Sequence, residues 1–382
     1  MEYLTLKDIA IINMGQSPNS KTYNDKKKGI PFYQGKSDFG KINPIPRVWC
    51  SNPIKIAEKD DILISVRAPI GDTNIATERC CIGRGLASIR PLNKNINQKY
   101  LYYLLNSKYN ELNKFGTGST FKAITKDNLC DLKCNKIPNI REQIEVVKKL
   151  DNVNQIIEIK KKQVKDLNTI VKSQFVEMFG DPKLNDKNWI KAPMGDYMTV
   201  LTDFSSNGSY KTLDSIVVMY DEPNYAYMVR TTDLENEDYK NNVKYITEEA
   251  YNFLSKSKVY TDDIIMNKIG SAGKVYIMPD VGMPVSLGRN AFLFRYNNDI
   301  VPLFIYYLLK SEYGTNEISQ YVRGAVTKTI TKDDVRKVKI IVPPIELQNK
   351  FADIVKQIDK QKFESEIELR KIQKNIFYKW GR

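Results

Sequence analysis

Loops rich in arginine, lysine, amide and hydroxyl side chains carry the strongest chemical signal in this sequence. In the first of them, three lysines precede the segment Phe32-Tyr33-Gln34-Gly35-Lys36-Ser37, which adds aromatic and amide groups. Lysine and arginine attract phosphate, arginine can donate two hydrogen bonds to guanine, and glutamine can pair with adenine. Readout groups are often held on loops. These residue types therefore predict a nucleic-acid-binding surface.

The candidate contact residues form two sets, one in each half of the chain. The first set is Lys26, Lys27, Lys28, Gln34, Lys36, Arg67, Arg84, Thr117, Ser119 and Lys122. The second set is Lys211, Lys268, Ser271, Arg289, Arg323, Thr327 and Lys328. Each loop taken alone also has the composition of an ordinary solvated loop. Their recurrence at matching places in both halves favours the binding interpretation.

No catalytic centre is predicted. The chain contains no histidine, so a general base near neutral pH would need a carboxylate or lysine with a strongly shifted pKa. There is no GxxxxGK[ST] phosphate loop, and Asp221-Glu222-Pro223-Asn224-Tyr225 has the wrong order for an adenine-methyltransferase motif of the Asn-Pro-Pro-Tyr type. The five cysteines form no paired CxxC motifs, so we expect free thiols, no metal site and a reducing compartment.

Length and charge limit the class of protein further. A chain of 382 residues is long enough for two domains with their own cores, and its apolar runs are too short to span a bilayer. The N-terminus lacks a signal-peptide pattern, so a soluble, cytoplasmic protein is expected. The net charge of +14 favours polyanionic partners, although a basic composition also occurs without one.

The chain repeats itself after about 205 residues, a period far longer than the roughly 20 to 50 residues of a solenoid repeat. Gly83-Arg84 returns as Gly288-Arg289, and Leu101-Tyr102-Tyr103-Leu104-Leu105 returns as Ile305-Tyr306-Tyr307-Leu308-Leu309. In each copy, short apolar runs bounded by turn residues indicate strands, and the Tyr-Tyr-Leu-Leu segments indicate helices. A whole α+β domain has therefore been duplicated.

Each copy ends in a long helix-like segment. The first has apolar residues at a strict spacing of seven, at Leu150, Ile157, Val164, Val171 and Met178. This heptad pattern predicts a coiled-coil helix, and about 38 residues make a rod of roughly 55 Å. The last segment of the chain repeats the pattern, so the two helices most simply pack on each other. An antiparallel pair would place the copies at opposite ends of the rod, and a parallel pair would place them side by side.

We therefore divide the chain into four segments. They are a first domain at 1–139, a first helix at 140–180, a second domain at 181–342 and a second helix at 343–382.

A known family has the same motifs. Arg67-Ala68-Pro69-Ile70-Gly71, Ile82-Gly83-Arg84-Gly85-Leu86-Ala87 and the Pro-x-x-x-x-Gln opening of each helix resemble the specificity subunits of type I restriction-modification systems. The similarity covers essentially the whole chain, but the second copy reads Lys268-Ile269-Gly270-Ser271-Ala272-Gly273 at the first of these motifs. The resemblance implies two pseudo-symmetric mixed α/β target-recognition domains joined by a two-helix antiparallel coiled coil.

The resemblance also implies a function. Each domain would read one half of a split double-stranded DNA sequence, and the helices would set the gap and dock the methyltransferase subunits, of which two are expected. Those subunits and the restriction subunits would bring S-adenosylmethionine, ATP and Mg²⁺, so that this chain binds no cofactor or metal and is not catalytic alone. Two alternatives stay open, a self-contained DNA methyltransferase or nuclease and a bipartite DNA-binding scaffold without a restriction partner.

The two copies differ in charge. Residues 1–180 hold 30 basic and 18 acidic side chains, whereas residues 181–382 hold 29 and 27. We expect the first domain to supply most of the attraction for phosphate and the second mainly base readout. The acidic cluster Asp233, Glu235, Glu237 and Asp238 is expected to face away from the nucleic acid.

Overall fold

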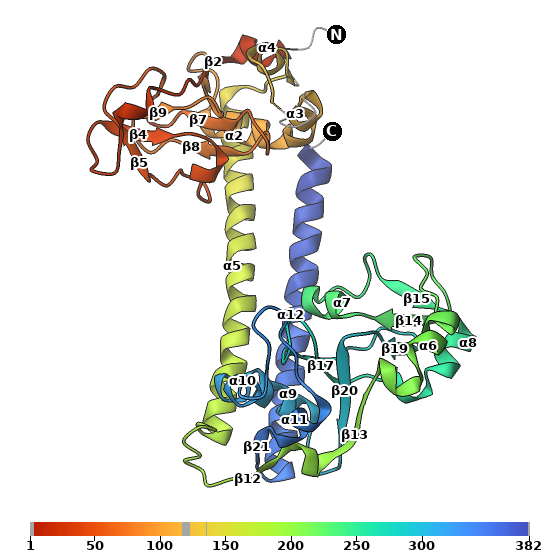
Figure 1. Ribbon diagram of the computed structural model, residues 1–382. Helices are drawn as coiled ribbons and strands as arrows, with labels where there is room; N and C mark the ends of the chain where they lie inside the picture. Colours follow the sequence, from red (N-terminus) through yellow and green to blue (C-terminus); the bar gives the residue numbers. More distant parts are fainter. Residues whose placement is uncertain (1–3, 117–122, 135, 381–382) are drawn as a thin grey trace. The chain divides into compact units, whose positions relative to one another are not determined.

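The computed structural model describes residues 4–116, 123–134 and 136–380, with the backbone alone for 373–380. Its internal contacts divide the chain into two compact units, Met1–Lys162 with Glu366–Arg382 and Gln163–Ser365. Each unit contains one copy of the repeat and a part of each long helix (Figure 1). Within the described ranges, no helix combines the length and apolar character needed to cross a lipid bilayer.

The described residues of the first unit form two larger sheets and one two-stranded pair. One has the strand order β2-β10-β7-β8 and is antiparallel throughout. Its strands are β2 (Ala10–Met14), β7 (Ile62–Ser65), β8 (Thr73–Ile75) and β10 (Leu86–Pro91). The other has the order β3-β5-β4-β9-β6, with β4 and β9 parallel. Its strands are β3 (Tyr23–Asn24), β4 (Ile30–Tyr33), β5 (Val48–Cys50), β6 (Ile56–Ala57) and β9 (Cys80–Ile82).

Short helices cover the first of these sheets. They include α1 (Leu6–Ile9), α2 (Gln98–Ser107), α3 (Tyr109–Phe115) and α4 (Lys126–Cys130). A short antiparallel pair joins β1 (Leu4–Thr5) to β11 (Lys133–Cys134). Helix α2 begins where the Asn97 side chain accepts hydrogen bonds from the backbone of Lys99 and Tyr100, as an N-cap residue does. Its buried face, with Leu101 and Leu105, packs against the sheet.

The second unit repeats this architecture. Its antiparallel sheet, with the order β13-β20-β17-β18, contains β13 (Met198–Asp203), β17 (Ile264–Asn267), β18 (Val275–Ile277) and β20 (Ala291–Tyr296). Its mixed sheet, with the order β15-β14-β19-β16, contains β14 (Ala226–Val229), β15 (Lys244–Ile246), β16 (Lys258–Val259) and β19 (Val285–Leu287). The pair β12 (Ile190–Pro193) and β21 (Lys339–Val342) corresponds to β1 and β11.

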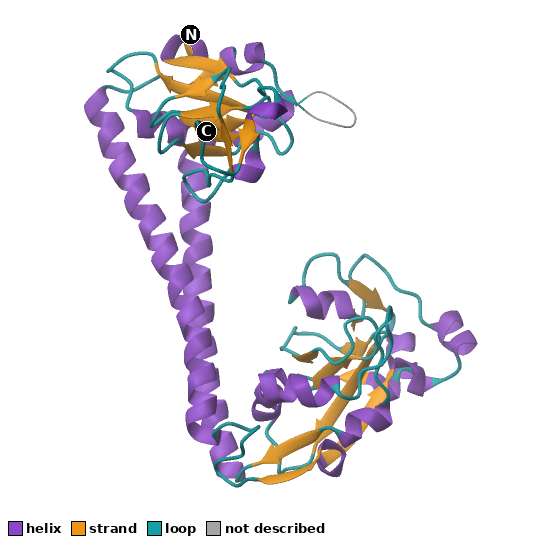
Figure 2. Cartoon of the chain, turned by 60° about the vertical axis from the view of Figure 1, so that its left-hand side comes forward, coloured by secondary structure: helices purple, strands orange, loops and turns teal. Residues whose placement is uncertain are grey.

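The helices of the second unit lie beside these sheets (Figure 1, Figure 2). They include α6 (Tyr210–Ile216), α7 (Thr231–Asn236), α8 (Glu248–Phe253), α9 (Pro302–Lys310), α10 (Glu312–Ser319) and α11 (Lys332–Lys337). A 3-10 turn, η4 (Phe204–Asn207), follows β13 directly.

The duplication predicted from the sequence is confirmed by equivalent strands and ion pairs. β14 and β19 are parallel neighbours, as β4 and β9 are. Asp61, just before β7, accepts hydrogen bonds from both Nε and Nη2 of Arg90 at 2.7 Å. Asp263, just before β17, accepts the same pair from Arg295 at 2.6 and 2.7 Å. The repeated Asp and Arg letters of the sequence are thus a repeated cross-strand ion pair.

A central strand of the antiparallel sheet in each unit, β7 or β17, is buried on both faces. In β7, Ile62 and Ile64 face the helices, whereas Leu63 faces the mixed sheet. In β17, Ile264 and Ile265 divide in the same way. Strands buried on both sides lose the alternation of polar and apolar residues, which explains the continuous apolar runs in the sequence. The cysteines are free, as expected, and all except the half-buried Cys130 are buried.

The two long helices are α5 (Ile140–Phe179) and α12 (Ile345–Trp380). In the second unit, the last turns of α5 pack on the first turns of α12, because the rings of Phe175 and Phe179 each lie 5.4 Å from the ring of Phe351. In the first unit, Lys160 Nζ lies 2.7 Å from Glu368 Oε2. Contacts move forward along α12 as they move back along α5, from Phe175 with Phe351 to Lys160 with Glu368, so the helices are antiparallel and the parallel alternative is wrong. The heptad seam is partly buried, whereas the aromatic contacts were not predicted.

Candidate nucleic-acid interface

In the first unit, β2, β4, β7 and β9 end at one edge of the sheets. The parallel strands β4 and β9 bring their carboxyl ends together, and the amide of Gly83 donates to the carbonyl of Tyr33 at 2.8 Å. Strands β2 and β7 both pair antiparallel with β10, so their ends flank its beginning. The amide of Val66 donates to the carbonyl of Gly85 at 2.9 Å, which joins two of the loops. We call the loops 15–17, 34–38, 66–71 and 83–85 the first edge.

Four predicted contact residues meet on the first edge. The Nε2 group of Gln34 donates to Ser17 Oγ at 3.1 Å, and the Gln34 side chain is exposed. Lys36 Nζ lies 2.6 Å from the carboxylate of Asp72. Arg67 and Arg84 are exposed, and within the described part of the chain neither forms an ion pair. The first edge therefore offers two guanidinium groups without a neutralising carboxylate.

The three consecutive lysines predicted in the first copy do not join this edge. Lys26, Lys27 and Lys28 precede β4, at the opposite end of that strand from Gln34. They are exposed, and Lys27 Nζ lies 5.8 Å from the centre of the Trp49 ring. Thr117, Ser119 and Lys122 lie outside the described residues.

The second unit forms an equivalent edge where β13, β14, β17 and β19 end. The amide of Gly288 donates to the carbonyl of Val229 at 2.7 Å, and the amide of Lys268 donates to the carbonyl of Asn290 at 2.8 Å. A hairpin loop lies beside it, because the amide of Gly270 donates to the carbonyl of Lys328 at 2.9 Å. We call the segments 204–207, 230–233, 268–273, 288–290 and 323–329 the second edge.

The arginines predicted on the second edge are paired with carboxylates. Arg289 forms an ion pair with Asp214 of α6. Arg323 Nη2 lies 3.0 Å from Asp334 Oδ1. The remaining predicted residues of this edge carry fewer contacts. Thr327 and Lys328 are exposed on the hairpin, Ser271 is half-buried on the turn after β17, and Lys211 is exposed on α6 beside the edge.

Lys268 is held in a buried polar network rather than presented to solvent. Its Nζ lies 2.8 Å from one carboxylate oxygen of Asp203, and Lys332 Nζ lies 2.9 Å from the other. Asp203 is only 7% exposed, and its burial would raise the pKa of the carboxyl group. Hydrogen bonds from Lys268, Ser206 and Lys332 outweigh burial and lower the pKa to about 2. The carboxylate therefore stays charged and fixes both lysines.

The turns after β7 and β17 have the same geometry despite their different letters. The amide of Gly71 donates to the carbonyl of Ser65, and the amide of Gly273 donates to that of Asn267, both at 2.9 Å. The two glycines have φ of 88° and 87°, a region that favours glycine. Counting from these bonds, Lys268 takes the place of Val66, and Ile269 takes the place of Arg67. The second copy thus has no arginine at this position of the turn.

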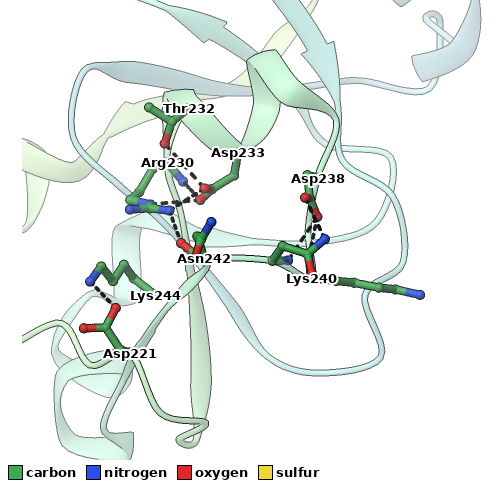
Figure 3. Close-up of polar contacts among 9 residues, drawn as sticks. Asp221, Arg230, Thr232, Asp233, Asp238, Lys240, Asn242 and Lys244 are labelled. Carbon is green, nitrogen blue, oxygen red and sulfur yellow. Dashed lines mark hydrogen bonds and ion pairs between the residues drawn. The ribbon is translucent and has the colours of Figure 1, made fainter. Parts of the chain in front are cut away.

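Arg230 is a residue of the second edge that the sequence did not single out. It follows β14 as Gln34 follows β4, and its Nε and Nη2 donate to the two carboxylate oxygens of Asp233 at 3.1 and 2.6 Å (Figure 3). Nη2 also donates to the carbonyl of Asn242 at 2.6 Å. The hydrogen bonds to Asp233 raise the pKa of the guanidinium group. An alignment of the two β-strand ends would have found it, because Gly83 and Gly288 bond to the residues just before Gln34 and Arg230.

Part of the acidic cluster lies on or beside the second edge. Asp233 caps the start of α7 and is buried against Arg230. Glu235 accepts a hydrogen bond from Asn267 Nδ2 at 3.0 Å, at the end of β17. Asp238 bonds to the backbone of Lys240 and Asn241 instead (Figure 3). Asp233 therefore lies on the second edge, where its carboxylate holds Arg230, and the expectation that the cluster faces away from the nucleic acid stays a prediction.

The two edges have the same frame and different electrostatics. The first edge exposes an amide and two arginines that have no ion pair among the described residues, which suits phosphate as well as base contacts. The second edge holds its arginines and Lys268 against carboxylates, which lowers its attraction for phosphate but keeps directional N–H donors in fixed places. Exposed N–H and amide groups held in this way can form hydrogen bonds with polar groups on a surface.

Comparison with known proteins agrees with this geometry. The model of the type I restriction modification DNA specificity domain matches residues 1–169 and 201–374, which takes in both edges. The putative type I restriction enzyme MjaX specificity subunit of Methanocaldococcus jannaschii is 43% identical over 152 residues, 40% of this chain. That match spans 36% of the relative, about a third of its length.

Two further matches extend over nearly the whole chain. The type I restriction enzyme MjaIX specificity subunit of the same organism is 24% identical, over 92% of this chain and 85% of the relative. The crystal structure of a type I restriction-modification S subunit from M. genitalium matches with a TM-score of 0.56 at 15% identity, covering 99% of this chain and 94% of that one, which shows the shared fold. With both copies matched by one family model, this chain belongs to the type I restriction modification DNA specificity family.

Proposed function

We propose that this chain is the specificity subunit of a type I restriction-modification enzyme and that each edge reads one half of a split DNA sequence. The observation that carries the proposal is the assembly of candidate side chains at the same edge of the same fold in both copies. The side chains differ at equivalent places, with Gln34 and Arg67 on the first edge where Arg230 and Ile269 stand on the second. Two copies of one fold that present different side chains suit a bipartite, asymmetric DNA site.

In this proposal, α5 and α12 set the length of the unread DNA between the half-sites and dock two modification subunits. Family membership supports this role, as does the length of α5, which runs for 40 residues. The modification subunits bring S-adenosylmethionine, and the restriction subunits bring ATP and Mg²⁺. This chain supplies recognition, and its partners supply the chemistry.

The proposal is tested by expressing the chain together with methyltransferase and restriction subunits encoded beside it. Methylated adenines mapped in the host DNA should fall in one split motif with a fixed gap. The double variant Arg67→Ala/Arg84→Ala should lose methylation at sites of that motif and relax the sequence of one half only. Arg79→Ala is the matched control, because Arg79 is exposed, pairs with Glu58 at 3.5 Å and precedes β9 at the end away from Arg84.

Three outcomes would contradict the proposal. Methyl transfer or DNA cleavage by the purified chain alone would make it a self-contained enzyme. Specific DNA binding without association with a methyltransferase would make it a scaffold. Equal relaxation of both half-sites by the double variant would mean that the first edge does not belong to one half-site.

A further inference from the structure

Two side chains restrain Arg289 on the second edge. It follows β19 and Gly288, where an added Cβ would lie 2.6 Å from the carbonyl oxygen of Val229, so the backbone is closely packed just before it. Its guanidinium carbon lies 5.4 Å from the centre of the Phe204 ring. Its Nη2 donates to the carboxylate of Asp214. A ring on one strand end and a carboxylate on a helix thus both restrain one guanidinium group.

The two restraining residues are themselves fixed. Phe204 is 3% exposed and packs in one core cluster with Leu213, the neighbour of Asp214 in α6. The Arg289 side chain nevertheless remains 48% exposed. An arginine carries five N–H donors, the ion pair with Asp214 engages Nη2, and among the described residues Nε and Nη1 have no hydrogen-bond acceptor. This is a rigid, directed donor group on the second edge.

The carboxylate partner decides between the two kinds of DNA contact. A phosphate beside Arg289 would also approach Asp214, which is 58% exposed and repels a second anion. A guanine edge carries no charge and presents O6 and N7 as acceptors for two N–H donors of one arginine. The pairing with Asp214 therefore disfavours phosphate and leaves base recognition in place. The equivalent Arg84 of the first edge is exposed and, among described residues, has no such ion pair.

Resting on the proposed function, we propose that Arg289 reads one guanine in the major groove of the second half-site, and that Asp214 and Phe204 are positioning residues for it. Arg230 and Lys268 are less suited to this role, because Arg230 already uses two nitrogens on Asp233 and Asn242 and Lys268 is held by Asp203.

The test measures binding of the intact complex to duplexes in which each guanine of the mapped half-sites is replaced in turn by 7-deazaguanine, which lacks the N7 acceptor. At one guanine of the second half-site, the wild type should lose affinity about tenfold or more. Arg289→Ala and Arg289→Lys should show a similar loss on normal DNA and no further loss with the analogue at that guanine. Asp214→Asn should lower the ratio of the affinity for guanine to the affinity for 7-deazaguanine at that position. Asp214→Glu should restore part of this ratio.

Arg336→Ala is the matched control, because Arg336 is also 48% exposed and paired with an aspartate, Asp333, on α11. It should leave every ratio unchanged. The proposal is overturned if Arg289→Ala weakens binding by the same factor on normal DNA and on every 7-deazaguanine duplex, which would indicate a phosphate contact. It is also overturned if replacing no guanine of the second half-site weakens binding of the wild type. Absence of sequence-specific binding in the wild type would instead contradict the proposed function itself.

Discussion

At the scale of single residues, the second edge differs from the first in having a buried carboxylate, that of Asp203. Asp203 pairs with Phe292 across the sheet, whereas the equivalent pair in the first copy is Met14 and Ala87. An ionised side chain at such a depth is costly unless it is paired and hydrogen-bonded. The second copy meets this need with Lys268 and Lys332, and the first has Val66 in the place of Lys268. One buried substitution thus removes a lysine from the set available to DNA.

The Asp203 network should make part of the second unit's stability depend on pH. Because folding lowers the pKa from about 3.9 to about 2, the stabilisation is complete above about pH 4 and is lost as the pH falls toward 2. Asp203→Asn should therefore be less stable at pH 7 by roughly 2 kcal/mol. Hydrogen exchange of the amides in β13 and β17 measures this difference.

The control is Asp196→Asn, whose aspartate lies on the short turn Met194–Tyr197 directly before β13, at the opposite end of that strand from Asp203. The difference in free energy of unfolding between the wild type and Asp203→Asn should decrease as the pH is lowered below about 4. A difference that stays constant from pH 7 to pH 2 would mean that the charge of Asp203 does not stabilise the fold.

At the scale of elements, one buried glutamine connects each long helix to its domain. Gln143 and Gln348 are fully buried. Gln143 Nε2 donates to the carbonyls of Asn95 and Pro138, both at 2.8 Å, and its Oε1 accepts from the amide of Asn97, just before α2. Gln348 makes the same three bonds before α9, to Asp299, Pro343 and Val301. The Pro-x-x-x-x-Gln motif is therefore a structural joint.

Gln143→Ala and Gln348→Ala should each destabilise their own unit by roughly 2–4 kcal/mol, because buried carbonyl and amide groups lose their partners. The loss should appear as faster hydrogen exchange in α2 for the first variant and in α9 for the second. Gln174→Ala is the control, since the half-buried Gln174 of α5 donates a hydrogen bond to the neighbouring Glu177 and, among the described residues, to no carbonyl of its domain. Equal destabilisation by all three substitutions would show that the hydrogen bonds of Gln143 and Gln348 do not stabilise their units.

The elements differ in how far the sequence reveals them. The duplication and the long helices were predictable, because repeated letters and a spacing of seven are local patterns. The meeting of β4, β9 and β7 at one edge was not, because strand order depends on pairings between distant segments. Gln34 and Arg230 occupy equivalent places without any shared letters around them. The aromatic contact of Phe175 with Phe351 was likewise hidden, since Phe175 lies outside the spacing of seven in the first long helix.

At the scale of the whole molecule, the charge difference between the halves has a local counterpart on the edges. The first half of the sequence carries 30 basic and 18 acidic residues, and the second 29 and 27. On the first edge, Arg67 and Arg84 are without ion pairs among the described residues, whereas Arg289 and Arg323 are paired with Asp214 and Asp334. A cation that already has a carboxylate counterion releases fewer salt ions when it meets phosphate. The two half-sites should therefore contribute unequally to the salt dependence of binding.

Binding of the full chain to its mapped site, measured at several salt concentrations, tests this inequality. Each phosphate contact contributes about 0.9 to the slope of log K against log salt. Arg67→Gln/Arg84→Gln should therefore flatten the slope by roughly 1 to 2, whereas Arg289→Gln/Arg323→Gln should change it by less than about 1, because those charges are already neutralised. The second pair should instead lose discrimination between cognate and altered half-sites. Equal changes of slope for the two double variants would mean that the carboxylates of the second edge release their arginines to phosphate, and that both edges bind DNA by the same electrostatics.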